Sequence, residues 1–236
     1  MEATGYVTLT RQSGLMREMQ VVANNIANGG TTGFRREGVV FSEFVRRAGD
    51  APSLSMALGG TRRVDLSEGA LNRTGGTFDF AIRGEGFFLI ATPEGDRLTR
   101  GGAFSPGPDG SLQTPDGHRL LDAGGAAVVL PGGAGKIALG ADGTISADGQ
   151  AFARIGLWLP EDPLTLRHAG GTMFMAEGVV PAEGGTLVQG ALEESNVDPV
   201  AEVARMIEVQ RSYELGQGFL EREDERMRGM IRMMGG

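Results

Sequence analysis

Hydrophobic residues recur at helical spacing near both ends of the chain, but not in its middle. From about residue 4 to residue 28, four apolar positions step by four, three and four residues, which places them on one face of a helix. From residue 198 onward, residues seven apart form two lines along a second helix. The N-terminal stripe is Leu15, Met19, Val22 and Ile26, and the C-terminal lines are Met206, Tyr213, Leu220 and Met227, and Val203, Gln210, Gln217, Asp224 and Ile231.

Local signals mark where the two predicted helices begin and end. Asp198 is a suitable N-cap, because its carboxylate can accept hydrogen bonds from the free N–H groups of the first turn. Pro199 follows at the first helical position, where a missing N–H is harmless. Gly29 and Gly30 supply a stop for the N-terminal helix. The C-terminal helix would be about 50 Å long.

The middle of the chain has a different pattern, in which short apolar runs are separated by Gly, Pro and Asp. FDFAIRGEGFFLIAT reads as two strands broken at RGEG, and the turn signal PDG occurs twice. The 40 glycines have no three-residue period, and their density would destabilise helices. We therefore expect a β-rich central domain over residues 64–195, together with an N-terminal helix and TTGF loop (1–35), a connecting arm (36–63) and a C-terminal helix (196–236).

Each predicted helix is amphipathic and cannot bury its apolar stripe alone. The simplest arrangement pairs the two helices with each other, with neighbouring copies of the chain, or both. Gln210, Gln217 and Asp224 make one C-terminal line partly polar. Polar residues at such positions lower stability but specify register and the number of partners.

Charge and composition exclude several kinds of partner and chemistry. The formal net charge of −8 and the pI near 4.9 argue against binding to nucleic acid or to an anionic membrane. The lack of cysteine excludes disulfides, thiolate metal sites and a cysteine nucleophile. No apolar run approaches the roughly 20 residues of a membrane helix. The first residues do not resemble a cleaved secretory signal, so any export is expected to use a route without one.

No group of side chains in the sequence points to catalysis. His118 and His168 are the only histidines, and no nucleophile-elbow motif surrounds a serine. A Ser-His-Asp triad stays open, because its members need not be neighbours in sequence. Asp142 and Asp148 lie in DGTISADG, which lacks EF-hand spacing and fits two Asp-Gly turns around a short strand. We expect no catalytic residue, metal ligand, cofactor or small-molecule substrate.

The stretch VVANNIANGGTTGFRRE places three asparagines in the last turns of the N-terminal helix. Each costs up to roughly 0.7 kcal/mol relative to Ala in a helix interior. They indicate either a frayed helix end or, as we favour, hydrogen bonds from Asn24, Asn25 and Asn28 to the next helix or to neighbouring copies. Asn25→Ala would then barely change the single chain but weaken assembly. Gly33 of TTGF could form a turn at positive φ, and could also position Phe34 between subunits.

Four motifs, in order along most of the chain, resemble those of the bacterial flagellar axial proteins of the rod and hook. QVVANNIANGGTTGFRRE is similar to the family's NN-x-AN helix end followed by TTGF[KR]; the doubled glycine is a departure from it. LEESNVDPVAEVARMIEVQRSYE is similar to its SNVD segment and following QR-x-YE helix. IRGEGFFLI and LTRGGAFSPGPDGSLQTPDGHRLL resemble the segments between. The length resembles rod rather than hook members, and YVTLTRQSGL resembles proximal-rod members, with distal-rod members as the alternative.

The resemblance implies an α+β fold in which long N- and C-terminal helices pair as a coiled-coil layer and a β-rich central domain lies outside it. It implies a structural subunit of the basal-body rod that leaves through the flagellar type III export apparatus, polymerises with its own copies and with neighbouring rod proteins, and transmits torque. An enzyme with helical oligomerisation arms and a non-polymerising adaptor are the competing hypotheses. The residues expected at the assembly interface are Leu15, Met19, Val22, Asn24, Asn25, Ile26, Asn28, Thr32, Gly33, Phe34, Asn196, Asp198, Pro199, Val203, Met206, Gln210, Tyr213, Gln217 and Leu220.

Overall fold

The computed structural model describes the backbone of residues 2–48 and 51–234, and the side chains of residues 8–40 and 62–233. The chain divides into two compact units. The helical unit comprises Met1–Ala27, Glu37–Arg63 and Asp198–Gly236. The β unit comprises Asn28–Arg36 and Val64–Val197. The TTGF segment, residues 31–34, therefore belongs to the β unit.

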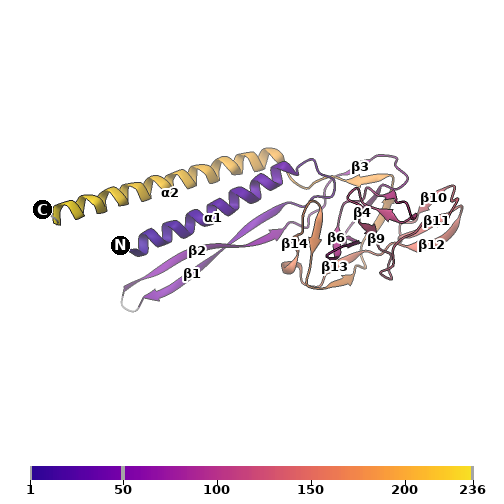
Figure 1. The fold of residues 1–236 in the computed structure, drawn as a ribbon, viewed down its shortest axis with the longest axis horizontal. Coiled ribbons are helices and arrows are strands. Elements are labelled where there is room, and N and C mark those ends of the chain that lie inside the picture. The colour runs from indigo at the N-terminus through magenta and orange to yellow at the C-terminus, as the bar shows by residue number, and fades with distance from the viewer. Residues whose placement is uncertain (1, 49–50, 235–236) are drawn as a thin grey trace. The chain divides into compact units, whose positions relative to one another are not determined.

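The helical unit is built from two helices and a β-hairpin (Figure 1). Helices α1 (Glu2–Ala27) and α2 (Pro199–Met234) lie side by side, and strands β1 (Glu37–Ala48) and β2 (Ala51–Val64) form a two-stranded sheet that packs against α1 through β1. The carboxylate of Asp198 accepts from the N–H of Val200 at 2.9 Å, which confirms the predicted cap. Pro199 is the first residue of α2, as the sequence predicts.

The prediction that the terminal helices form a coiled-coil layer is wrong. The described part of the unit contains one pair of helices, and a hairpin rather than further helix covers another side of α1. Most of the predicted connecting arm, residues 36–63, forms this hairpin. Because α1 packs against two different elements, it buries a wider face than a single stripe. Its buried residues are Gly14, Glu18, Val21, Val22 and Asn25, with Leu15, Met19 and Ile26 half-buried beside them.

One of the two predicted lines on α2 is also out of phase by one residue. The expected line with Met206, Tyr213 and Leu220 is half-buried. The residues that complete the α1-facing side are Glu202, Val209 and Gly216, whereas the expected Val203, Gln210 and Gln217 are exposed. Hydrophobicity favours Val203 over an acid for a buried position, because a buried carboxylate needs a partner. Here the partner exists: Asn25 of α1 donates to Glu202, which is only 2% exposed, while Val203 is 47% exposed.

The β unit is a set of short antiparallel sheets, as the glycine-rich pattern predicts. The largest sheet has the order β14-β15-β6-β5-β9-β8-β7, and the others are β10-β11-β12, β17-β4, β18-β3 and β13-β16. Their bounds are β3 Leu71–Arg73, β4 Phe80–Arg83, β5 Phe88–Thr92, β6 Gly95–Thr99, β7 Ser105–Pro106, β8 Leu112–Gln113, β9 Arg119–Leu120, β10 Ile137–Leu139, β11 Thr144–Ala147, β12 Gln150–Arg154, β13 Trp158–Pro160, β14 Arg167–His168, β15 Met173–Met175, β16 Val179–Pro181, β17 Thr186–Gln189 and β18 Ala191–Glu193; a short 3-10 helix spans Pro163–Thr165.

The core of the β unit follows from the alternation of apolar residues in these strands. Phe80, Phe88 and Phe104 pack together, with the Phe88 and Phe104 rings edge to face at 5.4 Å. The predicted Asp-Gly turns around β11 are confirmed. The Asp142 carboxylate accepts from the Thr144 N–H at 3.1 Å, and the Asp148 carboxylate accepts from the Lys136 N–H at 2.8 Å. These carboxylates stabilise turns.

Candidate assembly site

The TTGF segment lies against the β unit at its glycine. Gly33 has φ of +74°, and its N–H donates to the Glu193 carbonyl at 2.7 Å. A Cβ on this residue would lie 2.4 Å from the backbone carbon of Arg100, which is closer than any real contact. The position therefore requires glycine for both its conformation and its close approach to the backbone.

Phe34 is buried inside its own unit. It is 1% exposed, and its ring stacks on the imidazole of His168 with centroids 4.9 Å apart. The same imidazole lies 4.4 Å from the ring of Phe174, and its Nε2 is 2.9 Å from the Arg35 carbonyl. His168 thus has a structural position between two aromatic rings and the backbone of the TTGF segment. Phe34 stabilises the docked segment from within one chain.

The next residue, Arg35, enters a buried cluster of charges. Its guanidinium lies 2.8 Å from one carboxylate oxygen of Glu193, and Arg100 lies 3.0 Å from the other. All three side chains are at most 3% exposed. Arg35 also donates to the carbonyl of Ser67, and the Gly69 N–H donates to Glu193 at 2.9 Å. A buried carboxylate with two cations and an N–H is well compensated, and removal of one partner would leave an unpaired charge in the interior.

Arg100 is fixed on several sides. It donates to the carbonyl of Ile82 at 3.2 Å and to that of Gly84 at 2.7 Å, and its guanidinium carbon lies 5.4 Å from the centre of the Phe87 ring. Burial lowers the pKa of Arg100 to about 10, although the charge of Glu193 acts in the opposite direction. The guanidinium therefore stays charged at neutral pH and holds Glu193 in place.

Asn196 ties the two chain ends of the β unit together. Its side-chain oxygen accepts from the Arg36 N–H at 2.6 Å, and its amide nitrogen donates to the carbonyls of Asp65 at 3.1 Å and Ser67 at 2.9 Å. Motifs that are far apart in the sequence, TTGFRRE, LTRGG and LEESN, therefore meet in one buried polar cluster. The sequence analysis did not predict a role for Arg35, Arg100 or Glu193. Each of them lies within one of these three motifs.

Asn25 has an equivalent role in the helical unit. Its side chain is fully buried. The amide donates to the Glu37 carbonyl at 2.8 Å and accepts from the Glu37 N–H at 2.9 Å, while the same amide nitrogen lies 3.1 Å from Glu202. Burial raises the pKa of the Glu37 carboxyl, and the charge of Arg62 lowers it in part. Asn25 thus joins α1 to both β1 and α2.

This geometry corrects part of the hypothesis on the asparagines. The expectation that Asn25→Ala would barely change the single chain is inconsistent with three hydrogen bonds made inside that chain. Asn28 takes part in the turn at the helix end, where its carbonyl accepts from the Thr31 N–H at 3.0 Å and its side chain accepts from the Thr31 hydroxyl at 3.2 Å. Asn24 is exposed, so its role in assembly stays a prediction.

An ion pair also joins the two helices, and it was not predicted from the sequence. The Nε of Arg205 on α2 donates to Glu18 of α1 at 2.7 Å, and Glu208 lies 3.2 Å from the same guanidinium. The hydrogen bond with Glu18 raises the pKa of Arg205. Gln12 adds a bond to the Tyr213 carbonyl at 3.4 Å. These contacts set the antiparallel register of α1 against α2.

The other residues predicted at the interface are divided between buried and exposed positions. Among the described residues, Val22 is buried, and Leu15, Met19, Ile26, Thr32, Met206, Tyr213 and Leu220 are half-buried. Asp198, Pro199, Val203, Gln210 and Gln217 are exposed. Gln217 donates to the Tyr213 hydroxyl at 3.2 Å. Only the second group is exposed on the surface of the unit.

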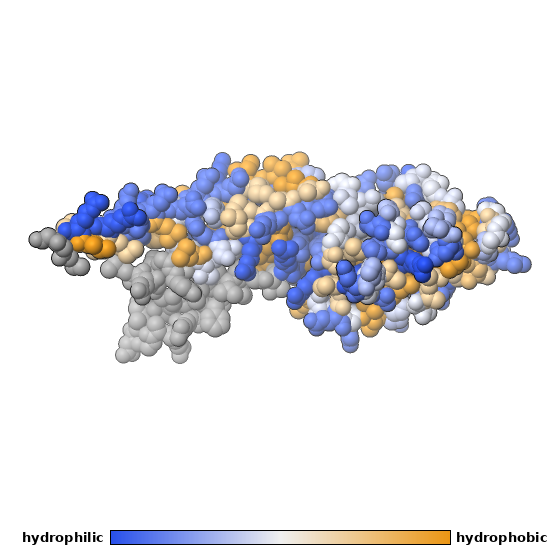
Figure 2. Space-filling model, in the orientation of Figure 1, coloured by the Kyte–Doolittle hydropathy of each residue, from blue (hydrophilic) through white to orange (hydrophobic). Residues whose placement is uncertain are grey.

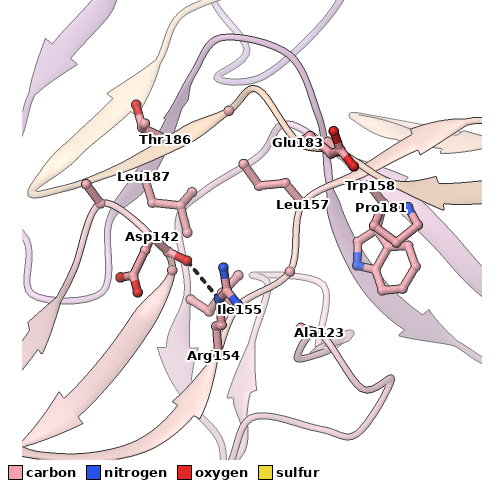
Figure 3. A pocket seen from close by; sticks show the side chains of 15 residues that line it. Ala123, Asp142, Arg154, Ile155, Leu157, Trp158, Pro181, Glu183, Thr186 and Leu187 are labelled. Atoms are coloured by element: carbon pink, nitrogen blue, oxygen red, sulfur yellow. Dashed lines mark hydrogen bonds between the residues drawn. The ribbon is translucent and has the colours of Figure 1, made fainter.

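The β unit also contains a cavity of about 680 Å³ (Figure 3). Part of its wall is apolar and is formed by Leu157, Trp158 and Leu187. Beside this part, the guanidinium of Arg154 donates to the Asp142 carbonyl at 3.1 Å. Hydrogen bonds from Thr144 lower the pKa of Asp142, and its carboxylate is already committed to the turn. Within the described part of the chain, no group of acids and histidines could hold a metal ion.

Comparisons with known proteins agree with the motifs. Residues 81–147 match the family described as flagellar hook protein FlgE/F/G D1 domain, and residues 188–233 match the flagellar basal body rod FlgEFG protein C-terminal family. The chain is 38% identical to the flagellar basal-body rod protein FlgF of Mesorhizobium japonicum, over 91% of this chain and 90% of the relative. It is 36% identical to FlgF of Caulobacter vibrioides, over 98% and 97%.

A related rod protein is less similar. The flagellar basal-body rod protein FlgG of Bacillus subtilis is 30% identical over 97% of both chains. None of the helices in the described residues has the length and apolar character needed to cross a membrane. The relatives are named as structural rod proteins, and their coverage extends over both units of this chain. The chain therefore belongs to the FlgF family of flagellar basal-body rod proteins.

Proposed function

We propose that this rod subunit polymerises through the exposed faces of its helical unit, in the proximal part of the rod, with its own copies and with neighbouring rod proteins. The observation that supports this proposal is the apolar surface of α2 (Figure 2). Val200 is 79% exposed and Leu215 is 73% exposed, with Val203 and Ile207 also exposed. Apolar side chains grouped on one helix are typical of a surface that another protein covers.

The position in the proximal rod rests on the higher identity to FlgF than to FlgG, 36–38% against 30%. The distal rod is the alternative position. The flagellar type III apparatus would export the chain, and the rod would cross the periplasm and carry torque to the hook. A chain without cysteine suits this route, since no disulfide can form before assembly.

Electron microscopy of basal bodies tests the proposal. A strain lacking its proximal-rod gene would carry either the wild-type chain or Val203→Glu with Ile207→Glu. We expect rods with the wild-type chain and truncated rods with the variant, because two carboxylates would have to be buried at a contact between subunits. Leu164→Glu is the matched control, since Leu164 is 66% exposed on the β unit. Normal rods in the double variant would rule out this face as the assembly surface.

A further inference from the structure

The α1-facing side of α2 continues beyond the point where α1 ends. Helix α2 has 36 residues and α1 has 26. The antiparallel pairs Asn25 with Glu202, Glu18 with Arg205 and Gln12 with Tyr213 fix the register. At that register the start of α1 reaches about residue 223 of α2. The last turns of α2, residues 226–233, therefore extend past α1 by roughly 15 Å.

This overhang, defined as residues 226–233, keeps the apolar character of the contact line. Met227 follows Met206, Tyr213 and Leu220 at seven-residue spacing, and Met230 and Ile231 lie beside it. Along the paired part of the helix the residues of this line are half-buried. In the overhang, Met227 is 46%, Met230 37% and Ile231 67% exposed. The overhang thus continues the contact line of the helix with apolar side chains that are exposed.

The charges of the overhang indicate which kind of surface can cover it. The overhang carries Arg226, Arg228 and Arg232 and no carboxylate. Glu223 and Asp224 pair with the first two of these from the preceding turn, but Arg232 has no acid of its own helix within four residues. Two overhangs packed on each other would bring these arginines together, which is unfavourable. A symmetric contact between overhangs is therefore disfavoured.

The opposite end of α2 has the complementary properties. Its outer face presents the exposed apolar residues Val200, Val203 and Ile207. Asp198 and Glu208 border this face against a single arginine, Arg205, whereas Glu202 of the same turns is buried on the α1-facing side. That arginine is shared between Glu208 and Glu18, so the charge near this face is negative. An apolar surface with an acidic border matches an apolar overhang with a basic one.

We propose that the overhang of one copy packs on the outer face of the first turns of α2 in a second copy. The two surfaces lie at opposite ends of one helix and differ from each other. The contact is therefore heterologous, and each copy leaves one surface of each kind for the next, so that the contact propagates. The inference rests on the proposed function, because it specifies which parts of the helical unit meet and with what polarity.

Disulfide cross-linking tests this contact cleanly, because the chain has no cysteine of its own. Met230→Cys and Val203→Cys would be expressed together in a strain lacking the chromosomal gene, and purified basal bodies would be oxidised. We expect a disulfide-linked dimer when both variants are present and none when either is alone. Replacing Val203→Cys by Leu164→Cys, on the β unit, should abolish the dimer.

Two results would overturn the proposal: assembled rods with no dimer from the mixed variants, or a dimer from Met230→Cys alone. If these variants do not assemble, the second pair Ile231→Cys and Ile207→Cys carries the same test. Failure of the wild-type chain to restore rods would reject the proposed function, and this inference with it. Restored rods without the cross-link would reject the inference alone.

Discussion

The side-chain amide of Asn25 hydrogen-bonds to both backbone groups of Glu37, in the way that a neighbouring strand would. The amide accepts from the Glu37 N–H at 2.9 Å and donates to the Glu37 carbonyl at 2.8 Å, as a backbone amide in a sheet would. The pair fixes the first residue of β1 to the last full turn of α1. Both residues are buried, so no water can replace either bond.

We therefore expect Asn25→Ala to lower the free energy of unfolding by about 2–3 kcal/mol, because the buried N–H and carbonyl of Glu37 lose their bonds to the Asn25 side chain, and Glu202 loses one of its contacts. Urea unfolding followed by circular dichroism at 222 nm measures this. Asn24→Ala, at the exposed neighbouring position, is the control and should change stability by less than about 0.5 kcal/mol. Equal midpoints for the two variants would show that the Asn25 bonds contribute nothing.

Gly33→Ala should destabilise the β unit by more than about 1 kcal/mol, because the added Cβ meets the backbone of Arg100 and because φ is positive. Thermal unfolding in the near-ultraviolet, where the single Trp158 reports on the β unit, is the measurement. Gly30→Ala provides the comparison, since a Cβ there has open space around it. A Gly33→Ala variant as stable as Gly30→Ala would mean that the segment can move away from Arg100.

Arg100→Met should cost about 3–5 kcal/mol of stability, because Glu193 would keep its buried charge with one cation fewer. Arg119→Met removes an exposed ion pair instead. The guanidinium of Arg119 lies 2.6 Å from the carboxylate of Asp109, and the two side chains are 52% and 46% exposed. The cost of Arg119→Met should stay below about 1 kcal/mol. Chemical denaturation of both variants at neutral pH gives the comparison, and similar losses for the two would contradict the importance of burial.

The raised pKa of Glu37 predicts a specific dependence of stability on pH. Between the unfolded pKa, near the ordinary 4.5, and the higher folded value, the folded chain binds more protons than the unfolded chain. Its contribution to stability is therefore fully present at lower pH and is lost as pH rises through this window. Glu37→Gln cannot titrate and should gain stability relative to the wild type as pH increases.

Arg62→Met gives an independent check on the same carboxyl. The charge of Arg62 lowers the pKa of Glu37 against the effect of burial. Without the charge of Arg62, the pKa of Glu37 in the folded chain should be higher, so the pH range over which stability is lost should extend to higher pH. Unfolding midpoints of all three chains between pH 4 and pH 7 decide the matter. A wild-type curve parallel to that of Glu37→Gln would exclude Glu37 as the source.

Sequence patterns predicted the two terminal helices and the β-rich middle, but neither the hairpin formed by β1 and β2 nor the polar contacts. The helix start at Asp198 and the Asp-Gly turns around β11 depend on neighbours within a few residues, so local chemistry determines them. The phase of the contact on α2 depends on Glu202 meeting Asn25, which is 177 residues away. Hydrophobic periodicity contains no information on such a pair, and therefore selected Val203.

The candidate site shows the same division. Glycine at position 33 could be recognised as a turn residue, but its need for space against Arg100 comes from packing. From the sequence, Phe34 could serve as an apolar anchor between subunits as well as follow an ordinary turn. Its cover, His168 and Phe174, comes from strands β14 and β15, more than a hundred residues along the chain. The pairing of strands that far apart cannot be read from local pattern.

Asn196 has a consequence for the time at which the chain can fold. It bonds to Arg36, 160 residues earlier in the sequence, so the cluster that receives the TTGF segment closes a long loop. A chain that emerges N-terminus first reaches this residue only near its end. Until then Arg35 lacks the carboxylate of Glu193, and the backbone N–H of Arg36 lacks the Asn196 oxygen. Contacts over such a distance form slowly, so the chain stays open at this cluster until the segment with Glu193 and Asn196 is present.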